Sequence, residues 1–106
     1  MDDTKYQTAF QIILHAGNSK SYSMMAMQKA REGQLTEAVE LVVQAGDALN
    51  EAHQIQTDLA QLEISGNSAD VNIIMVHAQD HLGMAMMMRD VANEVIHIYR
   101  RFGHVL

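Results

Sequence analysis

Apolar residues recur at intervals of three and four along almost the whole chain, which is the spacing of one face of an α-helix. Short breaks divide the pattern into three segments, which predict helices over residues 4–32, 35–64 and 70–102. Gly33 suits the left-handed position that ends many helices, and residues 65–70 are the expected loop before the third helix. Proline, which would interrupt a helix, is absent. The pattern therefore predicts an all-α protein, with Asp70 as a candidate N-cap of the third helix.

The first two predicted helices each present one apolar face. In the first helix, the regularly spaced positions are Tyr6, Ala9, Phe10, Ile13, Ala16, Gly17, Met24, Met27 and Ala30. In the second, a seven-residue repeat runs through Leu35, Ala38, Val42, Ala45, Leu49, Ala52, Gln56 and Leu59. Helices joined by short connections pack antiparallel. We therefore expect one domain over residues 1–106, folded as a three-helix antiparallel bundle.

The third predicted helix carries two apolar stripes. The first stripe contains Val71, Ile74, Ala78, His81, Ala85, Met88, Ala92, Val95 and Tyr99. The second stripe contains Ile73, His77, Asp80, Met84, Met87 and Val91. One stripe is enough to pack against the other two helices, so the second stripe needs another surface to cover it. Hydrophobic residues make up 48% of only 106 residues, which also favours burial between subunits. We predict that chains associate through the third helix.

Charge and composition exclude several classes of protein. The net charge of -6 and the lack of a Lys/Arg cluster argue against a nucleic-acid partner. Without cysteine, the chain can form neither a disulfide framework nor a thiolate zinc site. No apolar run reaches the roughly 18 residues of a membrane span, and the N-terminus does not resemble a signal peptide. We therefore expect a soluble cytoplasmic domain.

A polar cluster interrupts the apolar third helix near its middle. His77, Asp80 and His81 stand at positions i, i+3 and i+4, so their side chains are neighbours on the helix. Leaving such groups buried without partners costs on the order of several kcal/mol. Gln56 places an amide in the otherwise apolar repeat of the second helix. Because a buried amide needs a hydrogen-bond partner, we expect Gln56 to reach the His77 region and help hold that imidazole.

From the residues alone, three interpretations of this cluster stay open. It can be a structural polar contact that fixes how the helices pack. It can be a metal site, since two histidines at i and i+4 can share one ion, although the acidic residue does not follow the first histidine as in the H-E-x-x-H zinc motif. It can also be a phosphoryl carrier, in which a neutral imidazole nitrogen of His77 attacks phosphorus and His81 and Gln79 act as donors to the phosphoryl oxygens.

A resemblance to a known family favours the phosphoryl carrier. The segment Val76–Leu82 reads V-H-A-Q-D-H-L and resembles the signature of the enzyme IIA component of the lactose and N,N′-diacetylchitobiose/cellobiose family of the bacterial sugar phosphotransferase system. Further similarities follow in the same order, at Ala16-Gly17 with Ser21, Gly33 through Ala38, Glu51-Ala52-His53 with Gln56-Thr57, and Ile96 through Arg100. Departures from the family pattern include Ser19-Lys20, in place of Ala-Arg before Ser21, and Gly83-Met84, in place of Met-Thr.

The resemblance implies a reaction, an assembly and a set of partners. His77 is expected to accept a phosphoryl group from the histidine-containing phosphocarrier protein, as a phosphohistidine intermediate, and to pass it to a cysteine of enzyme IIB during disaccharide uptake by the membrane enzyme IIC. His81 and Gln79 are expected to border this site. A homotrimer is expected, with Asp80 from three subunits binding one divalent cation, usually Mg²⁺, on the three-fold axis. The alternative is a structural trimerisation module in which the polar cluster only sets the packing of the helices.

Overall fold

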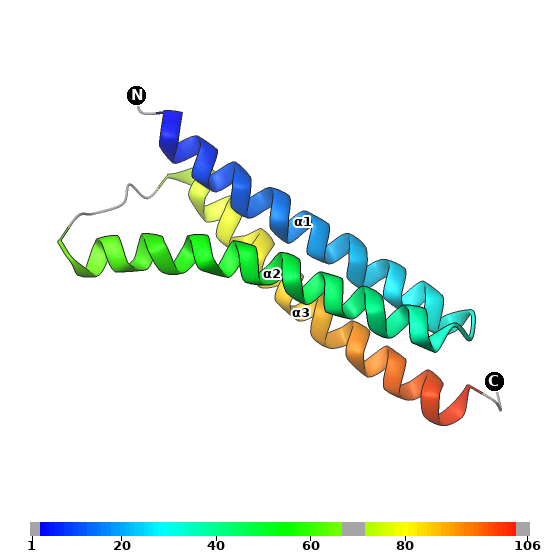
Figure 1. The fold of residues 1–106 in the computed structure, drawn as a ribbon. Helices are drawn as coiled ribbons and strands as arrows, with labels where there is room; N and C mark the ends of the chain where they lie inside the picture. Colours follow the sequence, from blue (N-terminus) through cyan, green and yellow to red (C-terminus); the bar gives the residue numbers. More distant parts are fainter. Residues whose placement is uncertain (1–2, 67–71, 104–106) are drawn as a thin grey trace.

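The protein folds as an elongated bundle of three helices, as the sequence predicts (Figure 1). The computed structural model describes the backbone of residues 3–66 and 72–103, and the side chains of residues 6–66 and 72–103. The helices are α1 (Asp3–Arg31), α2 (Leu35–Ile64) and α3 (Ile73–Phe102). Each helix runs antiparallel to the one before it. None of the helices in these ranges is long and apolar enough to cross a membrane.

The ends of the helices follow from local side-chain and backbone chemistry. Gly33 has a φ of 82°, so it takes the left-handed conformation predicted for the end of α1. At the start of α3, the side chain of Asn72 accepts a hydrogen bond from the backbone N–H of Met75 at 2.9 Å. This cap starts α3 at residue 73, three residues later than predicted. Asp70, the predicted N-cap, lies outside the described residues.

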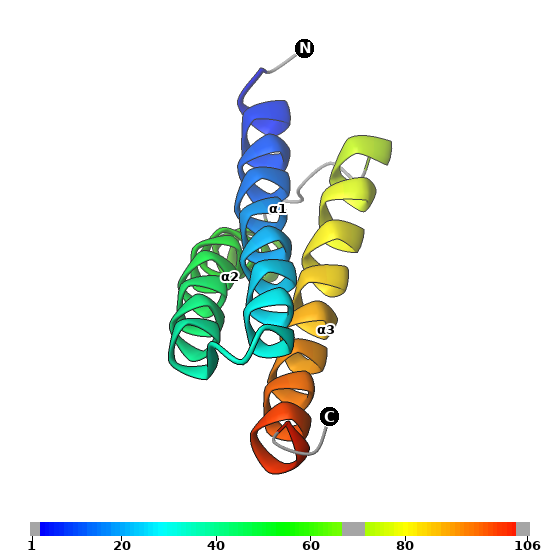
Figure 2. The same cartoon turned by 90° about the vertical axis from the view of Figure 1, so that its right-hand side faces the viewer.

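Helix α1 lies between α2 and α3 and packs against both with small side chains (Figure 2). Its buried positions alternate at spacings of three and four: Ala9, Ile12, Ala16, Ser19, Ser23, Ala26 and Ala30. Phe10 and Met24 belong to the apolar face that the sequence predicts, but they lie outside the core of the chain, since these side chains are 58% and 54% exposed. Short side chains let α1 approach two helices closely, and this close approach leaves the neighbouring bulky residues on the surface.

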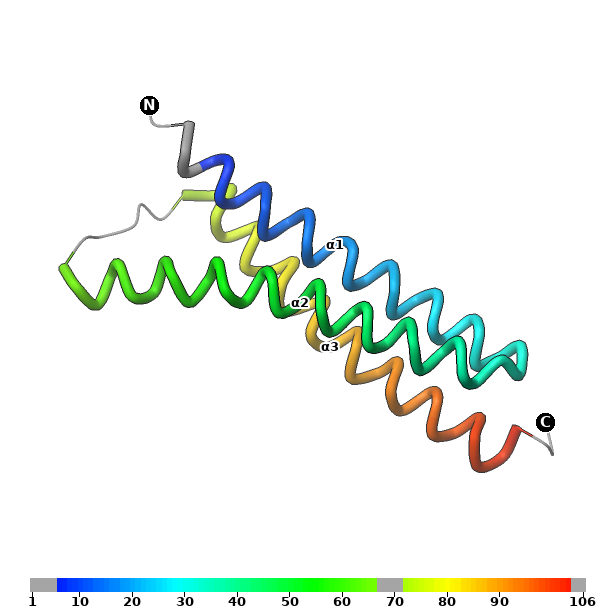
Figure 3. The backbone as a smooth tube through the Cα atoms, viewed as in Figure 1, coloured from blue at the N-terminus to red at the C-terminus, as the bar shows by residue number. Residues whose placement is uncertain are grey.

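Helix α2 buries the repeat that the sequence predicts. Its fully buried residues are Ala38, Val42, Ala45, Gly46, Leu49 and Ala52. Towards its C-terminal end, α2 diverges from the other two helices, as the tube in Figure 3 shows. Leu62 and Ile64 near that end are accordingly exposed. The packed core therefore extends through the first two thirds of α2 and thins beyond it.

Helix α3 uses one of its two faces for the core. Ala78, Leu82, Ala85, Ala92 and Ile96 are buried against the other helices. The second stripe is exposed along its whole length. Its six residues are Ile73, His77, Asp80, Met84, Met87 and Val91. Ile73 and Met87 are the extreme cases, at 82% and 69%. A single chain thus leaves the second stripe uncovered, which is the condition from which the sequence predicted association.

Candidate functional site

The two histidines at the middle of α3 contact each other directly. His77 and His81 lie one helical turn apart, and their Nε2 atoms are 3.1 Å from each other. The rings meet edge to face, with centroids 4.5 Å apart and an interplanar angle of 88°. His77 is exposed, whereas His81 is half-buried. The pair therefore leaves one imidazole accessible at the surface and keeps the other partly buried beside it.

Lys20 on α1 completes this site, and the sequence interpretation did not assign it a role. Its Nζ lies 2.8 Å from Nδ1 of His81, although the two residues are 61 positions apart in the sequence. Helix α1 therefore supplies the second partner of the His81 ring. A sequence signal for it exists. Lys20 comes one residue after Ser19, which is buried in the core-facing row of α1, and a long cation beside such a row can reach a neighbouring helix. We call the group formed by His77, His81 and Lys20 the imidazole cluster.

Burial and nearby positive charge keep the His81 ring neutral. Burial is the largest influence and lowers the pKa of His81 below its ordinary value of 6.5. The charge of Lys20 and the His77 ring lower this pKa further, while Asp80 opposes them. A neutral ring retains one nitrogen that can accept a hydrogen bond, which matches the approach of the Lys20 ammonium to Nδ1.

Gln56 and Gln79 form a separate contact between α2 and α3. The side-chain amide of Gln56 donates to Oε1 of Gln79 at 2.6 Å. The amide of Gln79 lies 3.9 Å from the sulfur of Met75. Both glutamines are partly buried, as the sequence predicts for Gln56. Among the described residues, neither glutamine hydrogen-bonds to an imidazole, so Gln56 is joined to the histidines only through the backbone of α3 and Gln79.

Asp80 lies on the exposed second stripe, away from the core. Within the part of the chain that the structure describes, no three His, Cys, Asp or Glu side chains come together as one metal site. Nε2 of His81 contacts Nε2 of His77 directly, so an ion shared by the two histidines would have to replace this contact. A single Asp80 carboxylate is also a weak site, although three copies brought together would supply the oxygen ligands that Mg²⁺ prefers.

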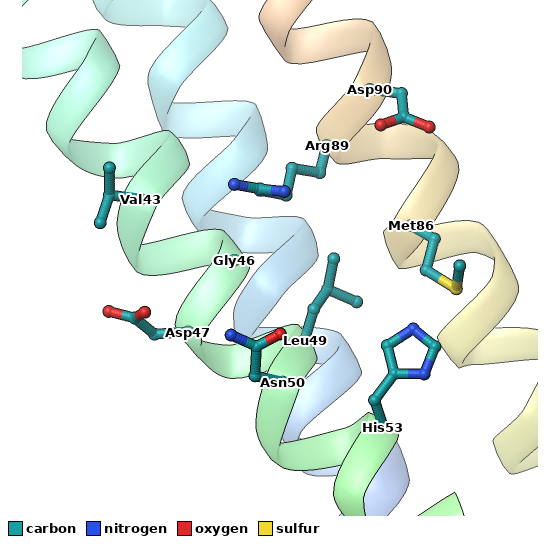
Figure 4. Close-up of a pocket in the computed structure, with 9 residues that line it drawn as sticks. All are labelled: Val43, Gly46, Asp47, Leu49, Asn50, His53, Met86, Arg89 and Asp90. Atoms are coloured by element: carbon teal, nitrogen blue, oxygen red, sulfur yellow. The ribbon is translucent and has the colours of Figure 1, made fainter. Parts of the chain in front are cut away.

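A hollow lies between α2 and α3, farther along the bundle than the imidazole cluster (Figure 4). His53 lines it from α2, opposite Met86 and Arg89 of α3. Arg89 extends over Gly46, and its Nε donates to the carbonyl of Val42 at 3.2 Å. His53 thus faces α3, but it borders this hollow and not the imidazole cluster.

Comparisons with known proteins show what kind of molecule carries this site. A model of the family "PTS system, Lactose/Cellobiose specific IIA subunit" matches residues 7–100. The lichenan-specific phosphotransferase enzyme IIA component of Bacillus subtilis (strain 168) is 42% identical over 101 residues, which cover 95% of this chain and 92% of that protein. The lactose-specific EIIA component of Lactococcus lactis subsp. lactis is 36% identical over 92 residues, or 87% of this chain and 88% of that protein.

A solved structure agrees with these sequence matches. The crystal structure of the PTS cellobiose-specific enzyme IIA from Bacillus anthracis superposes with a TM-score of 0.94 at 40% identity, covering 98% of this chain and 95% of that one. The fold and these similarities define a sugar-specific component of a phosphotransferase system (PTS). Within that class, the chain belongs to the lactose/cellobiose-specific IIA family.

Proposed function

We propose that this chain is a phosphocarrier in which His77 takes a phosphoryl group from the histidine-containing phosphocarrier protein and passes it to a cysteine of enzyme IIB. The observation that carries the proposal is an exposed imidazole, His77, whose Nε2 lies 3.1 Å from a half-buried imidazole. A nucleophilic histidine must be accessible to its partners and held in one orientation. His77 meets both conditions. The transfers serve uptake of a disaccharide by the membrane enzyme IIC, so the chain acts in the cytoplasm.

Each transfer exchanges one bond to phosphorus for another. In the first, the lone pair of a His77 ring nitrogen forms the N–P bond while the P–N bond of the donor histidine breaks and its electron pair returns to the donor. In the second, a thiolate of enzyme IIB attacks phosphorus and the electron pair of the N–P bond returns to His77. His81 stands next to His77, so it can donate to the phosphoryl oxygens.

The proposal includes a homotrimer built on the second stripe. Six exposed side chains of this stripe, four of them apolar, lie along one face of α3. Three chains packed on this face bury that apolar surface and bring three Asp80 carboxylates together. Like charges in an apolar interface repel, and a divalent cation such as Mg²⁺, bound by the three carboxylates, neutralises them. The cation then supplies charge balance to the assembly, while His77 carries the phosphoryl group.

The test is to incubate the protein with phosphoenolpyruvate, enzyme I and the histidine-containing phosphocarrier protein, and then to measure its mass. We expect a gain of one phosphoryl group, labile in acid and stable in base, as a phosphoramidate is. His77→Ala should gain nothing while its helical circular dichroism stays unchanged. Phosphorylation of the His77→Ala protein at the normal rate would refute the assignment. A wild-type protein that gains no mass would favour the structural trimerisation module.

A further inference from the structure

Lys20, His81 and His77 form a continuous row of hydrogen bonds from α1 to the exposed imidazole. Nζ of Lys20 lies 2.8 Å from Nδ1 of His81. Nε2 of His81 lies 3.1 Å from Nε2 of His77. Both ring nitrogens of His81 are therefore engaged, one on each side. The His81 ring therefore links the hydrogen bond from Lys20 to the position of the proton on His77.

The identity of the first donor decides every later proton in this row. A lysine ammonium has three N–H donors and no acceptor, so Nδ1 of His81 must accept. A neutral imidazole carries one proton, which must then sit on Nε2 of His81. That N–H points at Nε2 of His77, which must accept in turn. His77 therefore keeps its own proton on Nδ1 and its lone pair on Nε2.

We propose that Lys20 is a positioning residue that acts through His81 to hold the lone pair of His77 on Nε2. The consequence for catalysis rests on the proposed function, in which His77 is the nucleophile. Nε2 is then the nitrogen that forms the N–P bond, and the proton on Nδ1 stays out of the attack. The Nε2–H of His81 is released from His77 as the N–P bond forms, and it donates to a phosphoryl oxygen beside the same atom.

The surroundings of Lys20 fit a fixed donor. Ser19, its neighbour, is fully buried, and its hydroxyl donates to the carbonyl of Ala45 on α2 at 2.8 Å. This bond holds that turn of α1 in place on the side away from His81. Among the described residues, no carboxylate forms an ion pair with Lys20, in contrast to Lys29, which lies 3.4 Å from Glu37. Lys20 thus directs its charge to the imidazole cluster.

Imidazole ¹⁵N chemical shifts report tautomers directly and test this proposal at one neutral pH without any phosphoryl donor. In the full-length wild-type protein, we expect the proton on Nε2 of His81 and on Nδ1 of His77. Lys20→Arg, which also offers only donors, should keep both tautomers. Lys20→Glu offers only acceptors, so it should move the proton of His81 to Nδ1 and that of His77 to Nε2.

Lys29→Glu is the matched control, because it makes the same change of charge on the same helix away from the imidazole cluster. It should leave both tautomers as they are. A wild-type His77 protonated on Nε2, or unchanged tautomers in Lys20→Glu, would overturn the proposal. If Lys20→Glu loses its helical signal, the wild-type and Lys20→Arg shifts decide the matter alone.

Transfer rates then separate this proposal from the proposed function. Loss of one hydrogen bond from a charged donor to a working imidazole should slow the reaction by about 10- to 100-fold. We expect that loss in Lys20→Met, with recovery in Lys20→Arg. Expected tautomers in a wild-type protein that accepts no phosphoryl group would refute the proposed function and leave the tautomer assignment standing. Normal transfer by Lys20→Met would refute the role of Lys20 and leave His77 as the phosphoacceptor.

Discussion

The guanidinium of Arg89 occupies the space that a side chain at Gly46 would need. A β-carbon built on Gly46 would lie 2.7 Å from Nη2 of Arg89, closer than real β-carbons approach such an atom. From this position, Nε of Arg89 donates to the carbonyl of Val42. Glycine therefore lets an arginine of α3 lie flat across α2 and bind its backbone.

We expect Gly46→Ala to stabilise the protein only when Arg89 is removed as well. In an Arg89→Ala background, alanine should raise the free energy of unfolding by about 1 kcal/mol, because it is the better helix former. With Arg89 present, the new methyl group displaces the guanidinium. Losing a hydrogen bond from a charged donor, worth about 1.5 kcal/mol or more, then offsets that gain. Urea unfolding of the four proteins at one concentration measures the difference.

Gly17→Ala supplies the control for this cycle. A β-carbon at Gly17 meets nothing within 4 Å, and Gly17 lies inside α1. Its replacement should therefore stabilise the protein by about 0.5–1 kcal/mol in both backgrounds. If Gly46→Ala raises the free energy of unfolding equally with and without Arg89, the displacement of the guanidinium costs no stability.

His81→Ala is expected to slow phosphoryl transfer by roughly 100-fold or more, because it removes a positioned donor next to the attacking nitrogen of His77. Rapid-quench measurement of the phosphorylation rate gives the effect, and urea unfolding of the same variant gives its stability. His97→Ala, at an exposed position of the same helix, should leave the rate unchanged. A His81→Ala protein that loses stability but transfers normally would reduce His81 to a packing residue.

The lowered pKa of His81 predicts a loss of stability in mild acid. Burial, Lys20 and His77 lower this pKa below 6.5, so the unfolded chain takes up a proton at this position more readily than the folded one. Above 6.5, both states are neutral here and the full stability is present. As the pH falls below 6.5, the unfolded state gains protons first, so the contribution is lost until the folded ring also titrates.

His81→Gln isolates this effect, because glutamine can accept from Lys20 and donate to His77 but does not titrate. The free energy of unfolding of the wild-type protein should fall more steeply below pH 6.5 than that of His81→Gln. Parallel curves for the two proteins between neutral pH and mild acid would contradict the assignment of a depressed pKa to this ring.

Removal of divalent cations should weaken the proposed trimer near neutral pH. Without a cation, three Asp80 carboxylates repel one another, so a chelator should lower the melting temperature of the trimer. Asp80→Leu should remain trimeric in sedimentation without metal and still accept phosphate on His77. A wild-type trimer that ignores the chelator, or an ion bound by His77 and His81, would be incompatible with the axial cation.

The sequence predicted the helices and the uncovered stripe because both follow from local periodicity. It did not separate Phe10 and Met24 from the buried row, since two apolar rows run side by side on α1 and hydrophobicity alone does not tell them apart. Close packing of three helices instead favours alanine and serine. The sequence located His77 and His81 through their spacing on one helix. It did not locate Lys20, because the contact with His81 depends on how two distant helices align.

The central place of α1 has a consequence for how the protein becomes competent. Lys20 lies on α1, whereas the two histidines of the imidazole cluster lie on α3. The Lys20–His81 contact spans 61 positions of the sequence. Contacts between such distant positions form only after the intervening chain has been brought together, at the entropic cost of closing a long loop. A nascent chain that has completed α1 and α2 holds the lysine but neither histidine. With the proposed roles of Lys20 and His77, the tautomer of His77 is fixed only when α3 docks, so correct folding and readiness for phosphoryl transfer arrive in the same event.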